Sequence, residues 1–196
     1  MRIIESIYEE AALADERGDD RYTVAWDLDN TLVDETGWHV RPGAFAALRI
    51  LREAHVRQVV WTSSTTARAL DILRGLGMDR SFDALIGREG YALDEIRKNR
   101  RAEYHWIKKE FQGEKEFQAR FEYGKNLGVP GYDVLIDDNP KVRGQAAYWD
   151  FGYRVEVCEG FTGWTELEFP GDIERLAKKI TRLAHPPLLA RLGLAV

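Results

Sequence analysis

The sequence predicts an α/β fold in which a central parallel sheet of about five strands is covered by helices on both faces. Short apolar, β-prone runs alternate along the chain with stretches of helical periodicity, and this alternation is typical of parallel sheets. Several of the apolar runs also end in a cluster of polar residues. The 196 residues are enough for one domain with its own hydrophobic core, so we expect a single domain over 1–196.

The predicted strands are short runs of apolar, β-branched and aromatic residues. Strands that are buried on both faces of a parallel sheet have this continuous apolar character. We expect strands at residues 22–28, 56–61, 82–86, 134–136 and 153–157.

Helices are predicted where apolar residues recur every three or four positions. We expect an N-terminal helix over 1–17 and a C-terminal helix over 172–185, both packed on the core. The core itself is assigned to 22–86 and 125–158, and 87–124 to a helical insertion. Further helices are expected at 42–54, from the end of the 62–66 cluster to about 76, at 92–112 and at 141–149.

Composition and charge exclude several classes of protein. The formal net charge of -5 argues against a dedicated nucleic-acid-binding protein. No apolar run approaches the roughly 18 residues of a membrane-spanning helix, and the acidic first 20 residues do not resemble a secretory signal. Cys158 is the only cysteine, which excludes an internal disulfide and a CxxC metal site. We therefore expect a cytoplasmic protein without a membrane partner.

Acidic residues follow two of the predicted strands. In open α/β sheets, ligands bind beyond the carboxyl ends of the strands, so these side chains are expected to lie together. Their mutual repulsion favours a bound cation, and Mg²⁺ prefers carboxylate and phosphate oxygens. Lys125 could add a positive charge for an anionic substrate. The four carboxylates belong to Asp27, Asp29, Asp137 and Asp138.

Four segments together resemble the motifs of the haloacid dehalogenase (HAD) superfamily of phosphatases. DLDNTL at 27–32 looks like the DxDxT motif, and the apolar strand that closes at Thr62 looks like the second motif. Lys125 resembles the third motif, and LIDDNP at 135–140 the fourth. RPGAFAALRIL at 41–51, with the WTSS that follows, is similar to the small-cap branch of magnesium-dependent and CTD-type phosphatases. The resemblance implies a HAD-like Rossmannoid three-layer sandwich with only a small helical insertion.

The resemblance also implies a phosphomonoester hydrolase with named catalytic residues. Asp27 would be the nucleophile that forms an aspartyl-phosphate. Asp29 would protonate the leaving oxygen and then activate water. Thr62 and the backbone N–H of Ser63 would hold phosphate oxygens, and Leu28 belongs to the same phosphate-binding segment.

Mg²⁺ is the cofactor that the resemblance implies. Asp138 would bind it together with the carboxylate of Asp27 and the carbonyl of Asp29. Asp137 would position Lys125 or a metal-bound water. Lys125 would bridge Asp27 and the phosphate, stabilising charge in the transition state. The two adjacent carboxylates of the fourth motif also suit the N-terminus of a helix, which is compatible with metal binding.

The sequence leaves several alternatives open. Lys125 lies rather close to the fourth motif for this branch, so Lys115 and Arg120 remain alternatives for its role. A non-catalytic HAD-like binding scaffold is a second function. A nucleic-acid end-processing phosphatase, using the basic face at 97–109, is a third. The substrate, small molecule or phosphoprotein, and the oligomeric state also stay open.

Overall fold

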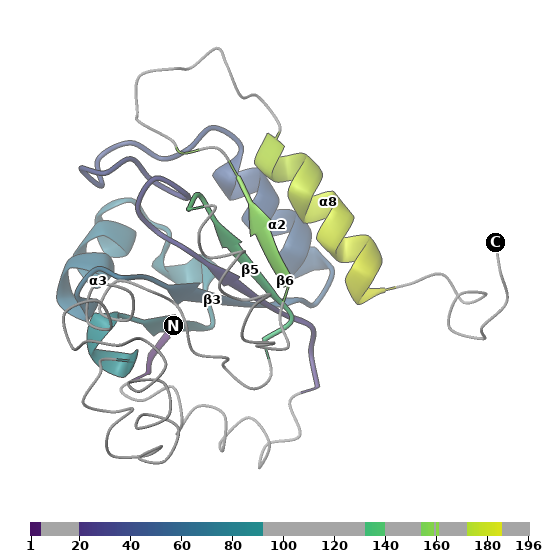
Figure 1. Cartoon of the computed structure of the whole chain (residues 1–196), viewed down its shortest axis with the longest axis horizontal. Helices are drawn as coiled ribbons and strands as arrows, with labels where there is room; N and C mark the ends of the chain where they lie inside the picture. Colours follow the sequence, from purple (N-terminus) through teal and green to yellow (C-terminus); the bar gives the residue numbers. More distant parts are fainter. Residues whose placement is uncertain (5–19, 92–131, 140–153, 159, 161–171, 186–196) are drawn as a thin grey trace, which may run out of the picture.

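The computed structural model describes residues 1–4, 20–91, 132–139, 154–158, 160 and 172–185. Its strands form one parallel sheet in the order β1-β4-β3-β2-β5-β6 (Figure 1). The predicted α/β class is therefore confirmed, and each of the five predicted strands is present. The strands are β1 (Arg2–Ile3), β2 (Thr23–Trp26), β3 (Arg57–Trp61), β4 (Ala84–Ile86), β5 (Val134–Asp137) and β6 (Arg154–Val157).

The order of strands changes direction at β2, which is the central strand of the candidate site. The chain runs from β2 outward to β3 and β4, and β5 returns to the opposite side of β2. Trp26 at the end of β2 pairs in register with Val60 of β3 and Ile136 of β5. In doubly wound α/β folds, such a change of direction is where ligands bind, at the carboxyl ends of the strands.

Three helices pack on one face of this sheet: α2 (Ala44–Glu53), α3 (Thr66–Gly75) and α8 (Asp172–Ala184). Helices α2 and α8 lie side by side along the sheet (Figure 1). Alternate strand residues share a single buried cluster with these helices, because successive side chains of a strand point to opposite faces. The cluster includes Val24, Trp26, Val60, Leu85, Val134 and Ile136 from the strands, and Leu48, Leu51, Leu73, Ile173, Ala177 and Ile180 from the helices.

Side chains on the other face of the sheet are buried as well. Val59, Trp61 and Leu135 are almost completely inaccessible, and the ring of Tyr132 meets Trp61 edge to face at a centroid distance of 6.1 Å. The helices expected at 92–112 and 141–149 lie outside the described residues. The third layer of the expected sandwich therefore stays a prediction.

The expectation of a helix from the N-terminus is wrong for its first residues. Arg2–Ile3 form strand β1, and the backbone N–H groups of Arg2 and Ile4 donate to the carbonyls of Asp83 and Leu85 at 2.8 and 2.9 Å. The partners lie on the edge of β4 that does not pair with β3. An apolar pattern in the local sequence cannot reveal that such an edge is available. Residues 5–17 of the expected helix lie outside the described part of the chain.

Two further boundaries differ from expectation or cannot be followed. Helix α2 begins at Ala44 rather than at 42, because Gly43 has a φ of 83°, in the left-handed region that glycine adopts without strain. The expected insertion at 87–124 begins with a short 3₁₀ helix, η2 (Arg88–Tyr91), and its remainder lies outside the described residues.

Among the described residues, no helix has both the length and the apolar character needed to cross a membrane.

The start of α3 approaches the end of β4 so closely that only glycine fits at position 87. A Cβ at Gly87 would lie 2.5 Å from the backbone nitrogen of Thr66 and 2.6 Å from its Cα. We expect Gly87→Ala to lower the free energy of unfolding by about 1–3 kcal/mol, measured by urea denaturation.

Gly75 is the matched control for this substitution. It lies at the end of α3, and an added Cβ would meet nothing within 4 Å. Gly75→Ala should leave stability unchanged or raise it by up to about 1 kcal/mol. Equal stability of Gly87→Ala and the wild type would contradict the close packing of α3 against β4.

Candidate functional site

Three carboxylates converge at the carboxyl ends of β2 and β5, where the order of the strands in the sheet reverses. Asp27 follows β2, whereas Asp137 ends β5 and Asp138 follows it. One oxygen of each lies within 4.8 Å of the others, and the exposed fractions of Asp27 and Asp137 are only 6% and 2%. Buried carboxylates at this spacing repel one another strongly unless a cation or a proton lies between them. Their hard oxygen atoms are the ligands that Mg²⁺ prefers, so this donor set fits the expected metal.

A tight turn directly after β2 places the first of these carboxylates. The carbonyl of Leu28 accepts hydrogen bonds from the backbone N–H groups of Thr31, Leu32 and Val33, at 3.3, 2.9 and 3.1 Å. Asn30 has a φ of 59°, a left-handed conformation that asparagine adopts more readily than most residues. The polar sequence after the strand therefore folds back on itself at the sheet edge.

Thr31 then connects the turn to both sides of the carboxylate cluster. Its Oγ1 lies 3.4 Å from Asp27 Oδ2 and 3.3 Å from Asp138 Oδ1, and it accepts a 3.1 Å hydrogen bond from the backbone N–H of Asp138. The buried side chain of Arg41 supports the same turn, donating from Nε to the carbonyl of Thr31 and from an amino group to that of Asn30. The side chain of Thr31 thus connects the turn to the end of β5; the sequence did not suggest Arg41.

The segment after β3 forms a second wall of the site. Thr62 is completely buried, and its Oγ1 accepts a 3.0 Å hydrogen bond from the backbone N–H of Ser64. The carbonyl of Ser63 accepts a 2.9 Å hydrogen bond from Arg88 Nε. Thr65 caps α3, with Oγ1 accepting from the N–H of Arg68 at 3.3 Å. In this structure Thr62 shapes the turn, and its predicted contact with phosphate stays a prediction.

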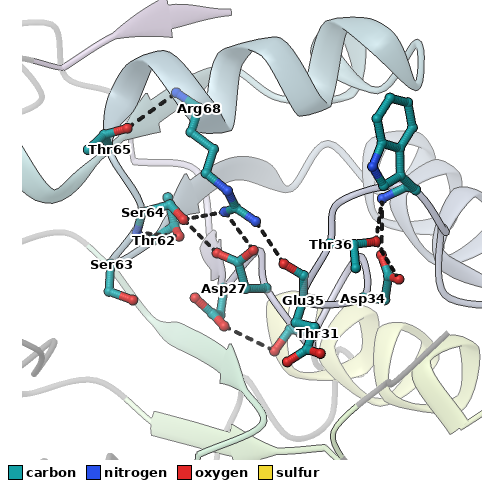
Figure 2. A network of polar contacts seen from close by, with 12 residues as sticks. Asp27, Thr31, Asp34, Glu35, Thr36, Thr62, Ser63, Ser64, Thr65 and Arg68 are labelled. Carbon is teal, nitrogen blue, oxygen red and sulfur yellow. Dashed lines mark hydrogen bonds and ion pairs between the residues drawn. The ribbon is translucent and has the colours of Figure 1, made fainter.

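The carboxylate of Asp29 lies with a different group of residues. Its Oδ1 is 2.7 Å from an amino nitrogen of Arg68, and its Oδ2 accepts a 2.7 Å hydrogen bond from Ser64 Oγ. Arg68 also contacts Ser64 Oγ and donates to the carbonyl of Glu35 at 2.9 Å, as Figure 2 shows for the labelled residues. Sequence reasoning missed Arg68 and Ser64, because Arg68 lies 39 positions from Asp29 and no motif contains it.

The structure brings together only part of the predicted site. Asp27, Asp137 and Asp138 meet as expected, whereas the Asp29 carboxylate is held by other groups and its carbonyl remains a predicted ligand. The side chain of Leu28 is completely buried. Lys125 and its alternatives, Lys115 and Arg120, lie outside the described residues.

A buried aspartate organises the loop that follows the turn. Asp34 accepts hydrogen bonds from the backbone N–H groups of Trp38 and His39, from Thr36 Oγ1, and lies 2.9 Å from His39 Nδ1. Burial by itself raises the pKa of Asp34, but the hydrogen bonds from His39 and Thr36 outweigh it, and the pKa lies far below its usual value. The loop presents Trp38 to solvent with 79% of its surface exposed.

Comparison with known proteins finds similarity among solved structures. No family model matches the chain, and no curated protein sequence does. The core domain of a Streptococcus pneumoniae protein assigned as a phosphoglycolate phosphatase is 19% identical, with 81% of this chain and 96% of that chain covered and a TM-score of 0.43. A Thermotoga maritima protein assigned as a beta-phosphoglucomutase is 15% identical, with coverage of 81% and 99% and a TM-score of 0.46. The HAD domain of the Legionella pneumophila effector protein Lem4 is 11% identical, with coverage of 84% and 97% and a TM-score of 0.46.

The low pKa of Asp34 predicts a pH-dependent contribution to stability. A carboxylate whose pKa is lower in the folded than in the unfolded state stabilises the fold above its unfolded pKa of about 4. This contribution is lost progressively as the pH falls below that value. We expect Asp34→Asn to lower the free energy of unfolding by about 1–3 kcal/mol at pH 7, with the difference from the wild type shrinking below about pH 4.

Denaturant unfolding at several pH values measures this difference. Glu35→Gln is the control, because the exposed side chain of Glu35 is next in sequence and its substitution should change stability by less than about 0.5 kcal/mol. A loss in Asp34→Asn that does not vary with pH would show that the charge of Asp34 is not what stabilises the loop.

Proposed function

We propose that this protein is a Mg²⁺-dependent phosphomonoester hydrolase of the HAD type, which acts through an aspartyl-phosphate on Asp27. The observation that supports this most strongly is the meeting of Asp27, Asp137 and Asp138 at the point where the strand order changes direction. Asp27 and Asp137 are buried and Asp138 is half-buried, and such a group is costly without a counter-charge, so its presence there favours a bound cation over a purely structural role. The DxDxT and DD motifs that suggested the function are the segments that supply these side chains.

Asp27, Asp137 and Asp138 would hold the cation. Bound there, Mg²⁺ would supply positive charge that neutralises phosphate oxygens and so eases attack by an anionic nucleophile. The backbone N–H of Ser63 would bind a phosphate oxygen, at the segment that leads into α3. Lys125 remains the residue proposed to add a further positive charge beside the phosphate.

The proposed reaction has two steps. A carboxylate oxygen of Asp27 attacks phosphorus, and the bond from phosphorus to the leaving oxygen breaks while Asp29 transfers a proton to that oxygen. Asp29 then takes a proton from a water molecule that attacks the aspartyl-phosphate, which releases inorganic phosphate and restores Asp27. The turn supported by Arg41 separates the two carboxylates, so that each lies among different partners and would take a different role in the reaction.

The wider setting of the enzyme belongs to the same proposal. The 41–51 segment favours the small-cap branch, in which an accessible site would accept a small phosphorylated molecule or a phosphoprotein. The composition favours a cytoplasmic location. Phosphorylated oligonucleotides belong in the substrate panel, because the basic stretch at 97–109 leaves that substrate class open.

Replacement of the proposed nucleophile provides the direct test. Asp27→Asn should reduce release of phosphate from p-nitrophenyl phosphate with Mg²⁺ to the background rate, because a neutral amide cannot form the phosphoenzyme. Asp71→Asn removes an exposed carboxylate of α3 and should leave the rate unchanged. A wild-type rate in Asp27→Asn would contradict the mechanism. Failure of the wild type on a panel of metabolites, phosphopeptides and oligonucleotides would favour the binding scaffold.

Removal of a proposed metal ligand tests the cation site without relying on turnover. Asp138→Asn should weaken Mg²⁺ binding by about tenfold or more, measured by isothermal titration calorimetry, because one anionic ligand is lost. Asp71→Asn is again the control and should bind Mg²⁺ like the wild type. Unchanged affinity in Asp138→Asn would exclude Asp138 from the metal site.

A further inference from the structure

Arg68 joins three segments that meet beside the proposed reaction site. It projects from the first turn of α3 and contacts Asp29, which follows β2. It also contacts Ser64 after β3 and the carbonyl of Glu35 in the loop beyond the turn (Figure 2). Its own backbone N–H is held by Thr65 Oγ1 at 3.3 Å, which fixes the base of the side chain. The guanidinium of Arg68 therefore links Asp29 with Glu35, and the three contacts together fix its position.

Both oxygens of the Asp29 carboxylate are engaged, and by chemically different partners. Oδ1 faces Arg68 at 2.7 Å, whereas Oδ2 faces the hydroxyl of Ser64 at 2.7 Å. A guanidinium can only donate hydrogen bonds, and Arg68 donates to Oδ1. The hydroxyl of Ser64 donates to Oδ2. The two contacts together fix the orientation of the Asp29 carboxylate.

We propose that Arg68 is a positioning residue that holds the Asp29 carboxylate in the orientation needed for the proposed reaction, an inference that rests on the proposed phosphatase function. Arg68 holds Oδ1 and thereby sets the orientation of the carboxylate. When Asp27 attacks phosphorus, the oriented Asp29 transfers a proton to the leaving oxygen as the bond from that oxygen to phosphorus breaks. In the second step Asp29 accepts a proton from the attacking water, which restores the starting state. Arg68 gains and loses no proton in either step.

The exposure of this pair is compatible with such a role. The side chain of Asp29 is 23% exposed and that of Arg68 is 38% exposed, so a substrate can reach the carboxylate while the guanidinium remains anchored. An exposed ion pair by itself contributes little to stability. The additional contacts with Ser64 and the Glu35 carbonyl point to a function in orientation, because they restrict the guanidinium to one place.

Phosphate esters with different leaving groups can distinguish two roles of Arg68, orientation of the general acid Asp29 and purely structural support. 2,4-Dinitrophenyl phosphate has a leaving group that departs without protonation, whereas phenyl phosphate requires a proton. Arg68→Gln should lower kcat/KM for phenyl phosphate by about 10–100-fold, because a misplaced acid transfers its proton poorly. For 2,4-dinitrophenyl phosphate, kcat/KM of the same variant should fall by less than about threefold. This ratio reports formation of the phosphoenzyme, and with this ester that step needs no proton from Asp29.

Two further variants keep the test decisive. Arg74→Gln removes an exposed arginine from the last turn of the same helix and should match the wild type with both esters. Arg68→Lys keeps the charge but cannot contact Asp29 and the Glu35 carbonyl together, so it should show a smaller loss with the same preference. Folding of both variants is judged by circular dichroism and thermal unfolding. If Arg68→Gln does not fold, the role of Arg68 is tested with Arg68→Lys, which keeps the positive charge beside Asp29.

Each outcome of this experiment bears on one of the two proposals. Equal losses with both esters, or no loss with either, in a folded Arg68 variant would overturn the role of Arg68 alone. Asp29→Asn calibrates the series and should show the same preference with a larger loss, about 10²–10⁴-fold for phenyl phosphate. No preference in Asp29→Asn, or no hydrolysis by the wild type, would overturn the proposed function and with it the role of Arg68.

Discussion

The parallel pairing of β2 with both β3 and β5 is the constraint on which the candidate site depends. Because all three strands run in the same direction and in register, their carboxyl ends meet at one edge of the sheet. The backbone N–H of Asp27 continues this pairing, donating to the carbonyl of Ile136 at 2.8 Å. Residues more than 100 positions apart in the sequence thereby become neighbours. The buried core beneath α2, α3 and α8 holds the strands in this arrangement.

The acidic side chains at this edge of the sheet fall into two groups with different partners. Asp27, Asp137 and Asp138 form a compact cluster that suits a cation, whereas Asp29 is held by an arginine and a hydroxyl. The tight turn at 28–33 creates the separation, because it reverses the chain directly after the first carboxylate. In the proposed mechanism, neighbours in sequence would therefore perform different chemistry: Asp27, Asp137 and Asp138 would bind positive charge, and Asp29 would exchange a proton.

Sequence reasoning recovered what depends on local pattern and on motifs. The strands were predictable because β-prone apolar runs end in polar clusters, and Asp27, Asp137 and Asp138 because carboxylates at strand ends meet in a parallel sheet. It failed where tertiary contacts decide. Arg2–Ile3 form a strand because β4 offers them an edge, and Arg68 reaches Asp29 across 39 positions from a helix with an ordinary amphipathic pattern. The predicted role of Lys125 remains a prediction, because it lies outside the described residues.

The central claim is that Asp27 becomes phosphorylated during turnover. Borohydride reduces an aspartyl-phosphate to homoserine, so wild-type protein can be treated with it during hydrolysis of p-nitrophenyl phosphate and digested for mass spectrometry. The account predicts homoserine at position 27, dependent on both substrate and Mg²⁺, with Asp29 and the other acidic residues unmodified. Turnover without any homoserine at position 27, or with modification at another carboxylate, would contradict it.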